Sequence, residues 1–119
     1  MRVLELVLEA FNRHDLDAIL AHFRPDAVFL APRGRDPWGT RFEGTEQIRR
    51  GFAARFEGLP DVSYESHGDF IAGDRGVSEW TLRGTTVDGM RIEVRGCDVW
   101  TFDGDKIAVK DSYWKIREP

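Results

Sequence analysis

Cysteine is nearly absent from this sequence. Cys97 is the only one among 119 residues, so an intrachain disulfide framework is excluded and a reducing, cytoplasmic setting is expected. Long apolar runs are also missing, because glutamates such as Glu5 and Glu9 interrupt the hydrophobic residues near the N-terminus. We therefore expect neither a secretory signal nor a membrane-spanning segment.

An excess of positive charge is missing too. The chain has 17 Lys and Arg against 21 Asp and Glu, a net charge of −4, so unspecific binding to nucleic acid or to an acidic membrane is not expected. The exception is a local group of arginines, which either recognises an anionic group of a substrate or lies solvated on a loop and a helix. Its members are Arg33, Arg35, Arg41, Arg49, Arg50 and Arg55.

Motifs for metals and cofactors are not found. The three histidines, His14, His22 and His67, are isolated, and no two have the spacing of a metal-binding pair. A phosphate-binding glycine loop, a Ser/His/Asp order and a Cys/His nucleophile pattern are missing as well. We expect a protein that uses no metal and no cofactor, in which His67 is the histidine that could line a cavity.

Hydrophobic residues at helical spacing predict three helices. The first has an apolar stripe over residues 4–11. The second begins after a capping Asp15 and turns Phe23 inward before a proline ends it. The third begins after a capping Thr45 and stops at residues 58–60, where Gly and Pro end the periodic pattern.

Alternating residues rich in β-branched and aromatic side chains predict strands, with glycine-containing turns between the last four. The expected extended segments are residues 27–31, 41–43, 63–72, 77–86, 90–102 and 106–116. Together they predict one domain over residues 1–119 with an α+β fold, in which three helices pack on one face of a curved, mainly antiparallel sheet. The concavity between helices and sheet is the expected pocket.

Asp98 is the residue that most needs an explanation. On the predicted strand, alternation places Asp98, Trp100 and Phe102 on one face. A carboxyl group on a buried aromatic face is disfavoured as a free charge, so we expect it to be kept neutral or to have a dedicated partner. Pairing with Lys110, or capping of a bulge, would make Asp98 structural. A role as neutral donor or general acid/base in the cavity would make it functional.

Aromatic residues are plentiful for so small a domain, with four tryptophans in the chain. Some of them must build the core. Because the indole N–H of a tryptophan needs a partner when it is buried, these rings also suit a ligand cavity. We expect Trp80, Trp100 and Trp114 to line the pocket in part.

Four segments carry a resemblance to a known family: FRPDAV at residues 23–28, FEGTEQIR at 42–49, EWTLRGT at 79–85 and GDKI at 104–107. In this order they resemble the SnoaL-like branch of the nuclear transport factor 2-like (NTF2-like) superfamily, over nearly the whole chain. The resemblance implies a cone-shaped fold with an apolar cavity, usually in a homodimer. It says less about function, since the superfamily includes cyclases, isomerases, epoxide hydrolases, dehydratases and binding modules.

The segments DVWTF at residues 98–102 and YW at 113–114 are similar to the ketosteroid isomerases, where the acid on this strand is a neutral oxyanion donor. The resemblance gives that role to Asp98. Ala31 and Val7 stand at the positions of that branch's general base and oxyanion tyrosine, so ordinary ketosteroid isomerase activity is not expected.

The cyclase and epoxide hydrolase branches place a working aspartate on the last strand. Here Ser112 stands at that position and Asp111 one residue earlier, so Asp111 reaches the cavity only through a bulge or a shifted register. Residues 79–81 also lack the Arg and Asp pair of the epoxide hydrolases, which disfavours a limonene-type activity.

The leading hypothesis is a SnoaL-like domain that takes a small, apolar organic molecule into its cone. Asp98 would donate to a developing oxyanion, and Asp111, His67 or Glu79 would remove a proton, in a cofactor-free cyclisation or isomerisation. The alternative is a non-catalytic module that binds a hydrophobic ligand or dimerises, with Asp98 as a buried polar anchor.

Overall fold

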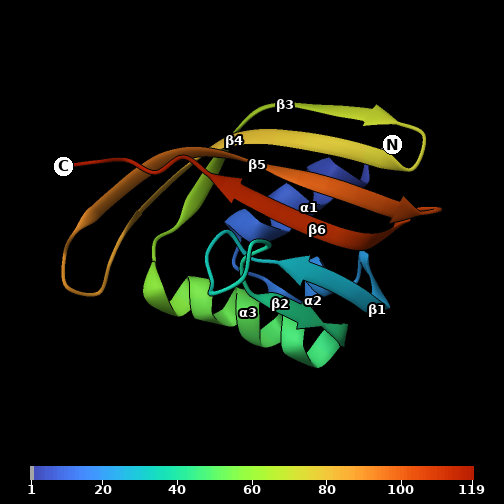
Figure 1. Cartoon of the computed structure of the whole chain (residues 1–119), viewed down its shortest axis with the longest axis horizontal. Helices are drawn as coiled ribbons and strands as arrows, with labels where there is room; N and C mark the ends of the chain where they lie inside the picture. The colour runs from blue at the N-terminus through green and yellow to red at the C-terminus, as the bar shows by residue number, and fades with distance from the viewer. Residues whose placement is uncertain (1) are drawn as a thin grey trace.

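The computed structural model describes residues 2–119 and has helices on one side of a curved six-stranded sheet (Figure 1). The predicted α+β architecture is confirmed. The elements, in chain order, are α1 (Val3–Asn12), α2 (Leu16–Leu20), β1 (Phe23–Leu30), β2 (Arg41–Glu43), α3 (Gly44–Gly58), β3 (Ser63–Ala72), β4 (Arg75–Thr85), β5 (Arg91–Asp103) and β6 (Lys106–Trp114).

The sheet has the strand order β2-β1-β6-β5-β4-β3. Its last four strands form the predicted antiparallel meander. The strand β1 lies beside β6 of this meander and pairs with it in parallel. The turn of the long β4–β5 hairpin reaches beyond the helices in Figure 1. Cavities remain between the inner face of the sheet and the helices α1 and α3.

The predicted cap of the second helix is confirmed, because the Asp15 carboxylate accepts a hydrogen bond from the Ala18 backbone N–H at 3.0 Å. Phe23 faces inward as expected and is buried in the core, but its assignment to that helix is wrong. The helix ends at Leu20, and Phe23 begins β1, where it pairs with Ile107 of β6. The pairing with β6 therefore determines the conformation of this segment more strongly than the helical spacing does.

The predicted cap of the third helix is also wrong. The helix begins at Gly44, ahead of Thr45, and its N-cap is Glu43, whose backbone N–H donates to the Gln47 side chain at 2.9 Å. Gly44 has φ of +84°, a conformation that glycine adopts at little cost. It lets the chain turn from β2 directly into α3, which leaves Thr45 inside the helix.

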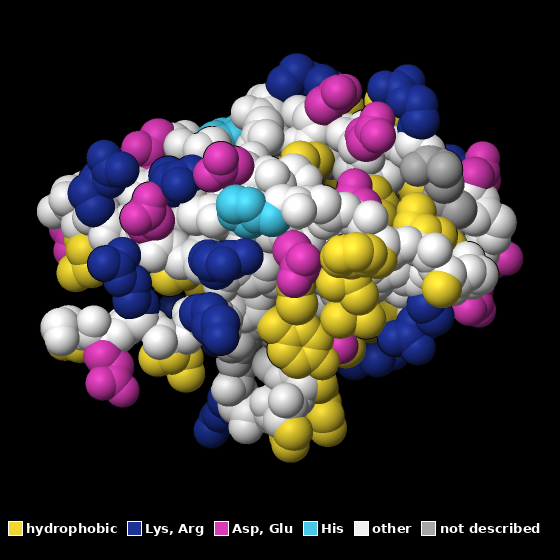
Figure 2. All heavy atoms as spheres, turned by 90° about the horizontal axis from the view of Figure 1, so that it is seen from above, with side chains coloured by type: hydrophobic (Ala, Val, Ile, Leu, Met, Phe, Trp, Pro, Cys, Tyr) yellow, Lys and Arg dark blue, Asp and Glu magenta, His cyan; other side chains and the backbone are white. Residues whose placement is uncertain are grey.

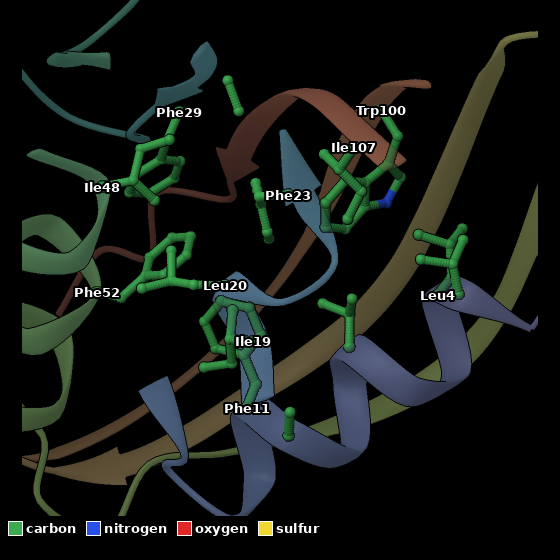
Figure 3. Packing of buried hydrophobic residues seen from close by; sticks show 14 of the residues in the cluster. Leu4, Phe11, Ile19, Leu20, Phe23, Phe29, Ile48, Phe52, Trp100 and Ile107 are labelled. Atoms are coloured by element: carbon green, nitrogen blue, oxygen red, sulfur yellow. The ribbon is translucent and has the colours of Figure 1, made fainter. Parts of the chain in front are cut away.

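The main core lies between the inner face of the sheet and all three helices (Figure 3). Phe11 from α1, Ile19 from α2 and Phe52 from α3 belong to one buried cluster with Phe23 and Trp100 of the sheet. A second cluster, containing Leu59 and Leu82, continues this core toward the β4–β5 hairpin. The α1 stripe and the alternation of β5 were both visible in the sequence, and the core confirms them.

In the described part of the chain, residues 2–119, no helix covers the outer face of the sheet, and this face keeps large hydrophobic side chains in solvent. Phe70 is 63% exposed and Tyr113 54% exposed. In Figure 2, hydrophobic side chains gather toward one part of the surface seen from above, and charged groups occupy much of the rest. Within residues 2–119, no helix is both long enough and apolar enough to cross a membrane.

Candidate functional site

The polar centre of the molecule is a buried cluster of Asp98, Lys110 and Ser112 on neighbouring strands. Asp98 pairs with Ser112 across β5 and β6, and Trp100 pairs with Lys110. Side chains of directly opposed residues share a face of the sheet, so all of these point inward. The predicted shared face of Asp98, Trp100 and Phe102 is confirmed by their burial.

A β-bulge in β6 produces this arrangement. Phe102 pairs with Ile107, but Thr101 pairs with Val109, so Ala108 is an extra residue without a partner on β5. Because facing alternates along a strand, the extra residue reverses which side chains of β6 turn inward after it. Lys110 is therefore inside, and Asp111 is outside. The expectation that a bulge would bring Asp111 to the cavity is wrong, because this bulge turns Asp111 away from it.

Three donors meet the Asp98 carboxylate. The Lys110 ammonium donates to Oδ1 at 2.9 Å, and the Ser112 hydroxyl donates to the same oxygen. The indole N–H of Trp80 donates to Oδ2 at 2.9 Å. The Lys110 ammonium also donates to Ser112 Oγ, at 2.7 Å. The dedicated partner expected for a carboxylate on this face is thus Lys110, and Asp98 is held as an acceptor of hydrogen bonds.

Lys110 is itself enclosed by aromatic rings. Its Nζ lies 4.8 Å from the centroid of Phe29, 5.4 Å from Phe11, 5.6 Å from Trp100 and 5.8 Å from Phe52. The faces of such rings attract a cation at these distances. Lys110 is only 7% exposed and Asp98 6%, so the ion pair operates largely without water, where electrostatic interactions are stronger than at the surface.

Two cavities meet at this cluster. The larger has a volume of about 230 Å³ and runs from the cluster to an opening beside Arg33 and Arg55. The smaller, about 30 Å³, lies under α1 beside Asp98. Both share the rings of Tyr64 and Trp80 and the side chain of Lys110. The smaller cavity has room for little more than water, so the larger one is the candidate ligand site.

Tyr64 presents a free hydroxyl to both cavities. Within residues 2–119, its hydrogen bonds are made by its backbone, with the Asn12 side chain, and its ring packs edge-on against Trp80 at 5.2 Å. Burial raises the pKa of the Tyr64 phenol far above its ordinary value; Arg55 opposes this shift and Asp98 adds to it. Tyr64 is therefore a neutral hydrogen-bond donor over the whole physiological pH range.

The raised pKa of Tyr64 is tested by titrating the protein with alkali. A Tyr113→Phe variant leaves Tyr64 as the only tyrosine. An ordinary tyrosine has a pKa of about 10, but we expect the folded variant to show no phenolate absorbance at that pH. Because folding raises the pKa of Tyr64, this residue does not change the free energy of unfolding below about pH 10. Above that pH it lowers the free energy of unfolding, since the phenol ionises more readily in the unfolded chain. Phenolate absorbance with a midpoint near 10, while circular dichroism still reports a folded chain, would contradict this assignment.

The predicted site residues divide into two groups. Trp80 and Trp100 are buried beside Asp98, and Trp114 lines the larger cavity. Asp111 lies on the outer face, where it accepts a hydrogen bond from the Tyr113 hydroxyl at 3.0 Å. The structure does not bring Asp111 to Asp98.

His67 and Glu79 also lie away from Asp98. His67 is the extra residue of a bulge in β3, and its Nε2 is 2.7 Å from the Thr81 hydroxyl on the outer face. Glu79 is an exposed residue opposite Cys97, at the rim of the smaller cavity. Within residues 2–119, no group of three His, Cys, Asp or Glu side chains is placed to hold a metal ion.

Sequence reasoning missed the position of Lys110 at the junction of the cavities, and it also missed Tyr64 and Arg55 as lining residues. Arg55 stacks over the Trp114 ring at 4.5 Å, and burial lowers its pKa. The cluster of arginines was visible in the sequence. Which of its members reach the cavity follows only from the packing of α3 against the strands.

Residues 4–110 match the model of the SnoaL-like domain. The chain belongs to this family. Among curated protein sequences, none matches this SnoaL-like chain.

Solved structures agree on the fold. An NTF2-like protein of unknown function from Burkholderia pseudomallei K96243 is 24% identical, with a TM-score of 0.85 over 97% of this chain and 89% of the other. TerC, co-crystallised with polyporic acid, is 20% identical, with a TM-score of 0.84 over 96% and 89%. A protein with a ketosteroid isomerase-like fold from Catenulispora acidiphila DSM 44928, in complex with trimethylamine, is 18% identical, with a TM-score of 0.83 over 96% and 85%. At these identities, the likeness establishes an NTF2-like fold for this SnoaL-like domain.

Proposed function

We propose that this SnoaL-like domain binds a small, largely apolar organic molecule in the larger cavity and acts on it by cofactor-free acid/base chemistry of the cyclase or isomerase type. The observation that carries the proposal is an aromatic cavity that ends on the buried Asp98–Lys110 ion pair. Its volume of about 230 Å³ exceeds the roughly 150 Å³ that holds one benzene molecule in an apolar cavity. TerC and the Catenulispora protein, crystallised with small molecules, support the use of this fold for binding.

The chemistry follows from the donors at the inner end. Two of the three N–H bonds of the Lys110 ammonium go to Asp98 and Ser112, which leaves the third for a ligand. A carbonyl oxygen placed there gains negative charge when an adjacent carbon loses its proton, and the ammonium and the Tyr64 hydroxyl would stabilise that charge. Asp98 contributes by pairing with the ammonium and holding it in position.

This role differs from the one that the family resemblance gives to Asp98. The donor toward an oxyanion would be Lys110, and Asp98 would act through it. No described residue in the wall of the larger cavity is Asp or Glu, so the proton would pass to water at the opening. Substrates with an acidic C–H bond, such as 1,3-dicarbonyl compounds, suit such a site.

A non-catalytic binding function is the second candidate, and one observation favours it. Within residues 2–119, every fully buried side-chain nitrogen or oxygen has a hydrogen-bond partner, so the cluster is complete without a ligand. A purely structural ion pair meets the same requirement. The expected homodimer stays a prediction: the exposed outer face with Phe70 and Tyr113 would carry it, and sedimentation velocity would detect it.

Benzoylacetone, an aryl 1,3-diketone, separates these functions. We expect it to raise the melting temperature, since a ligand at about 100 times its Kd adds roughly 2.7 kcal/mol. We also expect the protein to accelerate deuterium exchange at the carbon between the two carbonyls, followed by proton NMR. Tyr64→Phe should lower that acceleration by roughly tenfold or more, because it removes one oxyanion donor.

A cavity-blocking variant is the control. Ala31 lines the larger cavity, so Ala31→Trp should abolish both binding and exchange while the protein stays folded. Binding without accelerated exchange would leave the non-catalytic function in place and remove the catalytic one. Absence of binding to the wild-type chain would remove both.

A further inference from the structure

The larger cavity is positively charged, although the chain as a whole is acidic. Its wall contains Arg33, Arg55 and Lys110, and none of its described residues is Asp or Glu. Lys110 is neutralised by Asp98. Arg33 and Arg55 therefore bring two uncompensated positive charges to the opening, in a protein with a net charge of −4.

Arg55 is held in this position without an acidic partner. It belongs to α3, is partly buried, and stacks its guanidinium over the Trp114 ring at 4.5 Å. Burial lowers the pKa of Arg55; Tyr64 opposes this shift, and the nearby charge of Arg33 adds to it. Desolvation and repulsion both oppose the charged form here, and a bound anion would relieve both.

Among the arginines of residues 2–119 that form no ion pair with a carboxylate, Arg55 is the only one that is not exposed. Within residues 2–119, five arginines form ion pairs with carboxylates, and Arg33 and Arg55 are not among them. The paired ones are Arg2, Arg24, Arg41, Arg49 and Arg83. Of the crowded arginines in the sequence, Arg41 and Arg49 are thus explained by surface pairs. Arg33, Arg35 and Arg50 are exposed, and of these only Arg33 lines the cavity. Only the two at the cavity remain for a substrate.

We propose that the ligand of the larger cavity is an aromatic carboxylate, whose anionic group is bound by Arg55, with Arg33 adding charge at the opening. A guanidinium edge fits a carboxylate through two parallel hydrogen bonds. Stacking on Trp114 fixes the plane of that edge. The apolar rings of Phe29, Phe42 and Tyr64 line the rest of the cavity and would contact the aromatic body of the ligand. This inference rests on the proposed use of the cavity as the ligand site and adds the chemical class of the ligand.

A matched pair of probes tests the charge separately from the shape. 2-Naphthoate and 2-naphthamide have the same ring system and differ in one anionic group. By isothermal titration calorimetry at low salt, we expect the wild-type protein to bind the naphthoate at least tenfold more tightly. Arg55→Gln should remove this preference and leave the affinity for the naphthamide within about twofold, a pattern that a general loss of folding would not give.

Arg50→Gln is the control variant, because Arg50 lies on the same helix and is exposed. It should keep the preference for the naphthoate. Equal binding of both probes to the wild-type protein would overturn the anionic class and leave the proposed binding function standing. If Arg55→Gln and Arg50→Gln lost the preference for the naphthoate equally, the anionic class would also be overturned, because the preference would then come from the net charge of the protein and not from Arg55. If neither probe binds, this inference fails, and the binding of benzoylacetone decides whether the proposed function stands.

Discussion

Replacing Lys110 by methionine is expected to lower the free energy of unfolding by about 3–5 kcal/mol, as breaking a buried ion pair does. The loss comes mainly from Asp98, which keeps its burial and its negative charge but loses its cationic partner. Methionine has nearly the length of lysine, so the aromatic rings around position 110 stay filled and a packing defect adds little. Urea unfolding followed by circular dichroism measures the change.

A double variant distinguishes the ion pair from packing. Asp98→Asn combined with Lys110→Met removes both charges, and we expect it to be more stable than Lys110→Met alone, with a coupling energy of up to about 3 kcal/mol. Arg83→Met is the surface control, because Arg83 pairs with two exposed glutamates and exposed pairs contribute little. If the losses in free energy of unfolding of the two single variants simply added up in the double variant, the charges of Asp98 and Lys110 would not stabilise each other.

Gly96→Ala is also expected to destabilise the protein, although it adds a single methyl group. A Cβ at this position would lie 2.4 Å from the Tyr113 carbonyl oxygen and 2.5 and 2.7 Å from two carbons of the Trp80 ring. The ring cannot stay in place at such distances, and it carries the N–H that donates to Asp98. Overpacking of this kind costs about 1–3 kcal/mol.

Two measurements check this expectation. Urea unfolding gives the loss of stability, and the indole N–H resonance of Trp80 should shift because its hydrogen bond to the carboxylate is broken. Gly58→Ala is the control, since no atom lies within 4 Å of a Cβ built there. An unchanged Trp80 resonance in Gly96→Ala would mean that the ring and the Asp98 cluster are not coupled.

Much of the fold was predictable because local patterns determine it. The alternation of β5 gave the buried face of Asp98 and Trp100, and the capping pattern at Asp15 gave the start of α2. The errors fell where a tertiary contact outweighs the local signal. Phe23 pairs with Ile107 of β6, and no local pattern in the segment around Phe23 predicts that pairing.

The site was less predictable, because it depends on the register of one hairpin. Counting back from the Asp103–Lys106 turn without an insertion would set Asp111 opposite Asp98. With Ala108 unpaired, Ser112 takes that place and Lys110 comes inside. Nothing in the sequence around Ala108 distinguishes the two registers. The positions of Arg55 and Trp114 likewise depend on how α3 lies against the sheet, which is set by the whole core.

The unpaired Ala108 affects how this chain should be aligned with its relatives. Without that extra residue, the same β6 sequence would present a second carboxylate to Asp98, and two facing carboxylates share a proton where a Lys–Asp pair holds opposite charges. Insertion or deletion of one residue thus exchanges the reactive groups of the cavity without any substitution. Functional assignments within this family should therefore rest on strand pairing, because a sequence alignment that overlooks the extra residue matches side chains on opposite faces of the sheet.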